Sequence, residues 1–278
     1  MSDGQPLAIV AGTGFATLAP LADAQEQSVG TAYGTARLVR GTWHGLPIAF
    51  LPRHGAGHAT PPHLVNYRAN LAALRDIGCH DVIAVNVVGG IDPALTPGTL
   101  VCVDDFLDFT KTRQGTFHEG ALGGGVVHVD VSEAYSPPLR AEILAAADAA
   151  GRAMHDGGVY ACFEGPRFES PAEIRMARTL GADVVGMTGV PEVTLAVEAG
   201  MAYAAISLVV NPAAGLASGP IAMDGLDQAL AASVDDVLAV LDAIVRRRVA
   251  SAPAAGLIPR DITPARDVPV VDEGVGRR

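Results

Sequence analysis

Tyr160-Ala-Cys-Phe-Glu-Gly-Pro-Arg-Phe-Glu-Ser-Pro-Ala-Glu-Ile-Arg175 is the stretch around which the rest of the chain is organised. A β-like run over 159–163 ends at a Gly-Pro pair, and we expect a helix to follow, with Ser170 as its N-cap and a glutamate three residues later. Phe168 and Glu169 then lie on the short connector between strand and helix, where ligands bind more often than inside elements. An aromatic face beside a carboxylate suits a flat, polar ring.

The flanking sequence predicts an α/β domain. Short apolar runs are typical of buried strands, and longer stretches with helical periodicity are typical of covering helices. Strands are expected at 7–11, 47–51, 81–85, 99–103, 126–131 and 203–210, a loop-rich segment at 104–125, and helices at 66–74, 138–150, 193–199 and 224–250, the last capped by Asp224. The first three strands end in glycine-bearing turns, and in open α/β sheets ligands gather at that edge.

Composition narrows the class of protein and of partner. The 278 residues suffice for one large domain, placed at 1–250, and the Pro-rich segment 251–278 is predicted to be a disordered tail. The net charge of -11 argues against nucleic-acid and membrane-surface partners, since these require clustered Lys and Arg. Three cysteines without metal-like spacing, no secretory signal and no membrane-spanning run predict a soluble, cytoplasmic protein.

Several other chemistries lose their best evidence. The turn Gly12-Thr-Gly14 lacks the third glycine of a dinucleotide-binding fingerprint, and neither a nucleophile elbow nor a P-loop lysine pattern occurs. Glycines and prolines among His54, His58 and His63 prevent a helix there, so no metal site is predicted. What remains is an anion site beside the connector, expected to combine Thr13, Arg53, His54, the turn at Asn86 and Thr188.

Five motifs carry a family resemblance. They resemble, in order, those of the trimeric purine nucleoside phosphorylase and methylthioadenosine phosphorylase family over about residues 6–248: Ala11-Gly-Thr-Gly14, Arg53-His-Gly55, Asn66-Tyr-Arg-Ala-Asn70, Glu164-Gly-Pro-Arg-Phe168 and Gly186-Met-Thr-Gly-Val-Pro-Glu192. The resemblance implies a central mixed sheet flanked by helices, a homotrimer, no metal and no organic cofactor. The implied reaction is cleavage of a purine N-glycosidic bond, with inorganic phosphate as co-substrate attacking the sugar.

The same resemblance implies roles for individual residues. Asn211 and His54 are the implied catalytic residues. Phe168 and Met187 would pack on the base and the sugar. The implied phosphate-binding groups are Thr13, Arg53, His54, Thr188 and the backbone of Asn86 and Val87. Such a reaction passes through an oxocarbenium-like transition state, which an anion below the ring and hydrogen bonds to the departing base stabilise.

The choice of base depends on Glu169, Asn211 and Ala213. Family members that prefer 6-aminopurines have aspartates at the positions of Asn211 and Ala213, whereas those that use 6-oxopurines resemble this chain in having a glutamate at Glu169. A carboxylate accepts from the N1–H of a 6-oxopurine but repels the N1 lone pair of adenine. Paired hydrogen bonds of this kind can reject the mismatched base by roughly 10⁴-fold. The sequence therefore predicts a 6-oxopurine substrate.

The prediction of the substituent at the 5′ position of the substrate depends on His128, Ile221 and Met223. In the resemblance, His128 enters from a neighbouring subunit, and ordinary nucleoside phosphorylases place a histidine on the segment that holds Ile221 and Met223. These two apolar side chains suit a methylthio group, or they merely begin the last helix and face the core. The leading hypothesis is phosphorolysis of S-methyl-5′-thioinosine to hypoxanthine and 5-methylthioribose 1-phosphate. The alternatives are activity on inosine and guanosine, activity on methylthioadenosine, or a noncatalytic nucleoside-binding protein.

Overall fold

The computed structural model describes residues 5–15, 17–18, 20–55, 57, 59–119, 127–221 and 223–251. The tail predicted at 251–278 begins with Ser251, which is the last residue of a helix, and its remaining residues lie outside these ranges. His58 also lies outside them. In the described part, strands form at β1 (Leu7–Ala11), β2 (Ala22–Thr31), β3 (Gly34–Trp43), β4 (Leu46–Pro52), β5 (Asp81–Gly90), β6 (Leu100–Cys102), β7 (Asp105–Phe109), β8 (Met154–Asp156), β9 (Val159–Phe163), β10 (Val184–Gly186) and β11 (Ala202–Pro212). The α-helices are α1 (Tyr67–Asp76), α2 (Pro137–Ala149), α3 (Pro171–Thr179), α4 (Gly189–Glu198) and α5 (Met223–Ser251), and a short 3-10 helix covers Pro62–Leu64.

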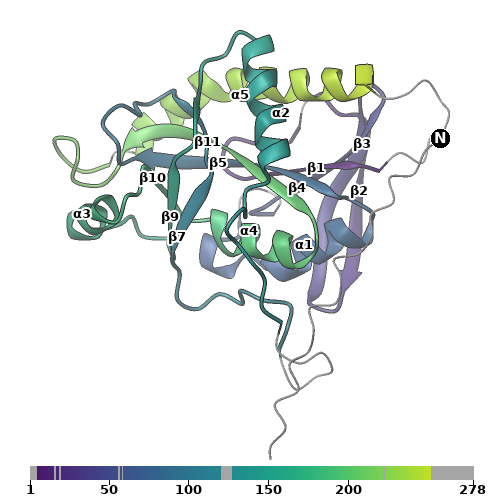
Figure 1. Cartoon of the computed structure of the whole chain (residues 1–278), viewed down its shortest axis with the longest axis horizontal. Helices are drawn as coiled ribbons and strands as arrows, with labels where there is room; N and C mark the ends of the chain where they lie inside the picture. Colours follow the sequence, from purple (N-terminus) through teal and green to yellow (C-terminus); the bar gives the residue numbers. More distant parts are fainter. Residues whose placement is uncertain are drawn as a thin grey trace, which may run out of the picture.

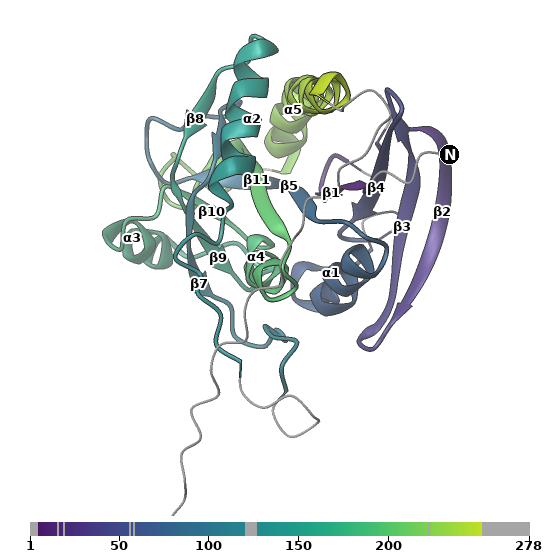
Figure 2. The same cartoon turned by 45° about the vertical axis from the view of Figure 1, so that its right-hand side comes forward.

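All of these strands join one mixed sheet. Its main path runs β2-β3-β4-β1-β5-β10-β9-β7, and β11 pairs with both β5 and β6. The central strands β4, β1, β5 and β11 are parallel, whereas β10 runs antiparallel to β5. Helices α2 and α5 cover one face of the sheet, and α1 and α4 cover the other (Figures 1 and 2). The α/β class and the central mixed sheet are thus confirmed.

The local signals around the connector hold in the structure. Strand β9 spans 159–163 as predicted, and α3 begins after Ser170 with a reciprocal capping box. The backbone N–H of Glu173 donates to Ser170 Oγ at 3.2 Å, and the N–H of Ser170 donates to Glu173 Oε2 at 2.7 Å. This pairing fixes where helix α3 begins and therefore where the connector ends.

Several predicted boundaries are wrong. Strand β5 does not end at Val85 but continues to Gly90, because β11 pairs with it along the whole length. Helix α5 begins at Met223, so Asp224 lies inside it and is not its cap. Strand β7 lies within the segment predicted to be loop-rich, and the described residues 127–131 form no strand.

The hairpin of β2 and β3 is absent from the sequence prediction altogether. Strand β2 reads Ala-Asp-Ala-Gln-Glu-Gln-Ser-Val-Gly-Thr, and most of its side chains are exposed. Such a polar edge strand carries little alternation of apolar and polar residues, and only pairing with β3 holds it in the sheet.

Candidate active site

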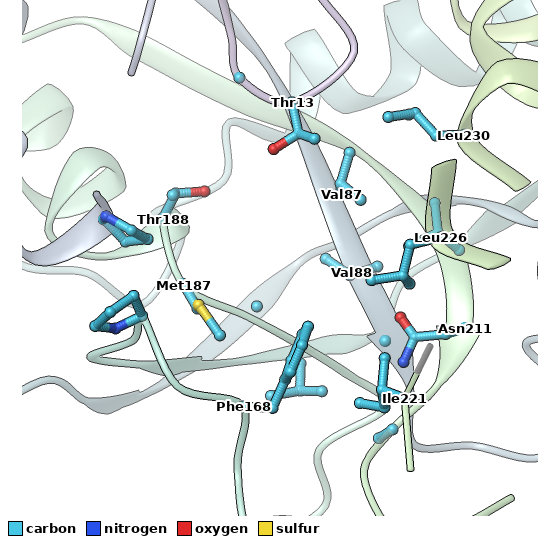
Figure 3. Close-up of a pocket in the computed structure, with 18 of the residues that line it drawn as sticks. Thr13, Val87, Val88, Phe168, Met187, Thr188, Asn211, Ile221, Leu226 and Leu230 are labelled. Atoms are coloured by element: carbon cyan, nitrogen blue, oxygen red, sulfur yellow. The ribbon is translucent and has the colours of Figure 1, made fainter. Parts of the chain in front are cut away.

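A cavity of about 440 Å³ lies at the edge of the sheet where the parallel strands end. Its walls come from the loops after β1 and β4, the middle of β5, the connector before α3, the segment after β10, the end of β11 and the first turns of α5. Figure 3 shows Thr13 and Thr188 toward one end, which we call the anion end. Phe168, Asn211 and Ile221 lie toward the other, which we call the base end. The site-residue predictions that the cavity brings together are Thr13, Arg53, His54, Val87, Phe168, Glu169, Met187, Thr188, Asn211, Ala213 and Ile221.

The anion end is built where β1 and β4 finish side by side. The backbone N–H of Arg53 donates to the carbonyl of Ala11 at 2.8 Å, which joins the two loops. A Cβ on Gly12 would lie 2.9 Å from His54 Cδ2 and 3.3 Å from Arg53 Nη1. Only glycine therefore lets the β1 loop, with Thr13, come this close to the arginine and the histidine.

Arg53 is held rigidly by a buried carboxylate. Its Nε and Nη2 donate to the two oxygens of Glu192 at 2.7 and 2.8 Å, and Nη1 donates to the Val85 carbonyl at 3.2 Å. Glu192 also accepts from Tyr203 Oη at 2.8 Å. Burial lowers the pKa of the Arg53 guanidinium, but the adjacent Glu192 charge and hydrogen bonds more than offset this, so the pKa lies above its usual range. The cavity thus contains a permanent, oriented cation.

His54 is fixed in one tautomer. Its Nδ1 lies 2.8 Å from the carbonyl of Thr60, and a carbonyl can only accept, so Nδ1 carries a proton. The residue is buried, with 5% exposed, and the other edge of the imidazole faces Gly12. In the neutral ring Nε2 therefore accepts a hydrogen bond, and in the charged ring it donates one.

Thr188 contributes its hydroxyl, while its backbone is engaged elsewhere. The N–H groups of Thr188 and Gly189 donate to Tyr160 Oη at 3.2 and 3.3 Å. The Thr188 hydroxyl lies 3.3 Å from Asn86 Oδ1. Asn86 itself does not line the cavity, because it sits within β5 with 1% exposed and turns its side chain toward Thr188. It supports Thr188 rather than forming the predicted turn.

At the base end, Glu169 has a buried carboxylate of which one oxygen, Oε1, has no hydrogen-bond partner among the described residues. The residue is 7% exposed, and its Oε1 accepts no hydrogen bond from any described residue. The nearby Arg167 is directed to Glu173, with two contacts of 2.8 Å. Burial raises the pKa of Glu169 and the charge of Glu173 adds to the rise, whereas a hydrogen bond from the backbone N–H of Glu169 itself and the charge of Arg167 oppose it. A donor entering the cavity would meet an acceptor that nothing in the described protein satisfies.

Asn211 faces the same end of the cavity from the last residues of strand β11. The register between β11 and β5 shifts between Val209 and Asn211, and such bulges redirect side chains. Its Nδ2 donates to the Pro212 carbonyl at 2.6 Å, which orients the amide. The Phe168 ring, 41% exposed, projects into the cavity opposite Asn211 (Figure 3). The base end therefore offers one aromatic face, one carboxylate and one amide.

Among the predicted residues that the structure describes, Asn86 and His128 do not line the cavity, and several lining residues were not predicted. His128 is exposed and does not line it, and the side chain of Met223 lies outside the described part of the structure. Conversely, Leu226 and Leu230 of α5 form part of the wall, although their spacing suggested only a core-facing helix. Apolar wall residues carry no sequence signal that separates them from core residues.

The described residues hold no group of three or more His, Cys, Asp or Glu arranged to bind a metal ion. No helix in the described ranges is long and apolar enough to cross a membrane.

Comparison with known proteins identifies the family. Residues 6–246 match the family model described as the phosphorylase superfamily. The chain belongs to this superfamily. It is an enzyme of the nucleoside phosphorylase type, which removes the alternative of a noncatalytic binding protein.

Three relatives of this phosphorylase illustrate the range of named activities. It is 51% identical to a probable 6-oxopurine nucleoside phosphorylase of Moorella thermoacetica, over 77% of this chain and 82% of that protein. It is 44% identical to a probable S-methyl-5′-thioinosine phosphorylase of Pseudomonas syringae pv. tomato, over 84% of this chain and 96% of that protein. A solved structure of the Schistosoma mansoni methylthioadenosine phosphorylase in complex with adenine superposes with a TM-score of 0.84 at 30% identity, over 89% of this chain and 93% of that one.

Proposed function

We propose that the enzyme catalyses phosphorolysis of 6-oxopurine nucleosides, with S-methyl-5′-thioinosine as its leading substrate. A phosphate oxygen forms a bond to C1′ of the sugar while the bond from C1′ to N9 breaks. The products are hypoxanthine and 5-methylthioribose 1-phosphate. The observation that carries this proposal is the buried, unpartnered Oε1 of Glu169 at one end of a cavity whose other end holds Arg53.

The Glu169 carboxylate supports a base that carries a proton on N1. A 6-oxopurine donates N1–H and satisfies the buried Oε1, whereas adenine presents a lone pair that leaves this oxygen without a partner. Asn211, oriented by Pro212, keeps a second amide hydrogen for O6 and an amide oxygen for a protonated N7. Protonation at N7 turns the departing base into a neutral leaving group.

The anion end supports phosphate as the nucleophile. Arg53 keeps its charge because Glu192 compensates it, and Thr13, Thr188 and His54 add hydroxyl and imidazole groups around the same space. A phosphate bound there lies beneath the sugar, where its negative charge stabilises the oxocarbenium-like transition state more than the ground state. Phe168 and Met187 would pack against the base and the sugar.

The wall next to the sugar supports a 5′-methylthio group. Leu226 and Leu230 line the cavity with apolar side chains, and Ile221 adds another toward the base end (Figure 3). The Pseudomonas relative is named for S-methyl-5′-thioinosine. The second candidate substrate class is inosine and guanosine, which the name of the Moorella relative favours. Both candidates carry a 6-oxopurine.

The resemblance to the trimeric family supports two further parts of the proposal. The enzyme would work as a homotrimer in the cytoplasm, with inorganic phosphate as co-substrate and no metal or organic cofactor. His128, exposed on its own subunit, would contribute to the 5′ end of a neighbouring site.

A substrate panel tests the proposal. Purified enzyme is given S-methyl-5′-thioinosine, inosine, guanosine and methylthioadenosine, with and without phosphate, and release of the free base is measured. Phosphate-dependent hypoxanthine release should be fastest from methylthioinosine. A preference for methylthioadenosine would overturn the role given to Glu169, and phosphate-independent release would overturn phosphorolysis.

A further inference from the structure

Arg113 lies outside the cavity, yet its side chain is almost wholly buried, with 2% exposed. Its Nη1 donates to the Val190 carbonyl at 2.6 Å and to Tyr67 Oη at 3.2 Å. Its Nη2 donates to the carbonyls of Glu164 and Phe163 at 2.7 and 3.2 Å. One guanidinium therefore joins three backbone carbonyls from two segments that are distant in the sequence.

These carbonyls belong to the two segments that carry the opposite ends of the cavity. Phe163 and Glu164 close strand β9 and open the connector that presents Phe168. Val190 follows Thr188 by two residues and has non-helical dihedrals, φ -117° and ψ 135°. Its carbonyl is directed to Arg113. The guanidinium, which lies outside the cavity, thus links the backbone segment of the base end to that of the anion end.

The carboxylate of Glu164 lies close enough to Arg113 to compensate its positive charge. The Nε of Arg113 lies 3.8 Å from Glu164 Oε1, and its guanidinium carbon lies 5.3 Å from the centre of the Tyr67 ring. Glu164 is itself fixed, since it accepts from the backbone N–H of Lys111 at 2.6 Å and from the hydroxyl of Thr112 at 2.7 Å. Contacts to several carbonyls in different directions suit a planar guanidinium and not an ammonium.

We propose that Arg113 is a positioning residue that sets the distance between the connector bearing Phe168 and Glu169 and the segment bearing Thr188. The inference rests on the proposed function, because the two segments would hold the base and the phosphate of one reaction. Misplacement of reacting groups by about 1 Å costs roughly 10²-fold in rate. Loss of Arg113 should therefore raise the KM of both substrates and lower kcat, although Arg113 touches neither.

The test compares Arg113→Ala with Arg113→Lys and with the wild-type enzyme. Arg113→Ala should lose about 100-fold in kcat/KM for the nucleoside, with both KM values raised. Guanidine hydrochloride, added far below denaturing concentrations, should restore much of this loss by filling the vacated site, and it should not activate the wild type. Arg113→Lys should remain strongly impaired. Arg152→Ala, which removes an exposed arginine paired with Asp236, is the matched control and should behave as the wild type.

A merely structural role would give a different pattern. Activity would then fall in proportion to the folded fraction seen by circular dichroism, KM values would not change, and guanidine would not help. That pattern, or an Arg113→Lys enzyme with wild-type KM values, would overturn the inference. If Arg113→Ala does not fold, the KM values of Arg113→Lys decide alone. Failure of the proposed function is distinct, because the wild-type enzyme itself would then release no base with phosphate.

Discussion

The two ends of the cavity differ in how far the protein satisfies the ionisable side chains that line them. At the anion end Arg53 has Glu192 and His54 has Thr60 as partners. At the base end Oε1 of Glu169 is buried with no partner among the described residues. An anion site can be complete before its ligand arrives, because a fixed cation is stable when paired. A site that selects one base leaves an acceptor unsatisfied, so that only the correct donor relieves the penalty.

Removing the partner of Arg53 at the anion end should give the largest effect, a loss of stability. Replacing Glu192 with Ala leaves the Arg53 guanidinium as a buried, uncompensated charge, which should lower the free energy of unfolding by about 3–5 kcal/mol. Urea denaturation measures this loss. Asp236→Ala, which removes the partner of the exposed Arg152, should cost at most about 1 kcal/mol. Equal losses in the two variants would contradict a preorganised anion end.

Changing the unpaired end should alter specificity more than stability. Glu169→Gln removes the charged acceptor for N1–H, and a hydrogen bond to a charged group is worth about 1.5–3 kcal/mol. We expect kcat/KM for methylthioinosine to fall about 10- to 100-fold. The KM for phosphate, which reports on the opposite end, is the internal control and should change little. An unchanged ratio of methylthioinosine to methylthioadenosine use would mean that Glu169 does not contact the base.

Acidification should weaken substrate binding by Glu169, and this should happen at a higher pH than the pH at which an exposed glutamate would lose its charge. Burial raises the pKa of Glu169, and only its charged form accepts N1–H. Because a carboxyl is charged above its pKa, kcat/KM for methylthioinosine should decline as the pH falls through that raised value, by up to about tenfold per pH unit. Profiles of the wild type and of Glu169→Gln provide the measurement. The acidic decline should be absent from the variant, and its persistence there would assign the titration to another group.

The smallest effect is expected at the apolar wall between the two ends. Leu226→Ser should lower the preference for methylthioinosine over inosine about three- to tenfold, since it removes roughly one or two methyl-sized contacts from the 5′ group. The measured quantity is the ratio of the two kcat/KM values. Val249→Ser, on an exposed part of the same helix, is the control and should leave that ratio unchanged. A ratio unaffected by Leu226→Ser would place the 5′ group elsewhere.

Local chemistry made parts of the molecule readable from the sequence. The capping box of Ser170 and Glu173 and the run of β9 depend on residues next to one another, so the start of α3 and the connector with Phe168 and Glu169 were predicted correctly. The glycine turn before Thr13 and the polar pair Arg53 and His54 were likewise placed at strand ends.

Only the tertiary structure decided which partners these residues meet. Nothing in the local sequence indicates that Glu192 compensates Arg53 across 139 positions, or that Arg113 joins β9 to the segment after Thr188. The same holds for Leu226 in the cavity wall. The hairpin of β2 and β3 differs, because its strands are neighbours in the sequence and only the polar character of β2 hides it. The physical reason is common to the other three. Periodicity and capping report on a residue's neighbours along the chain, whereas pairing across the fold depends on strand order and helix placement, which many different local sequences can satisfy.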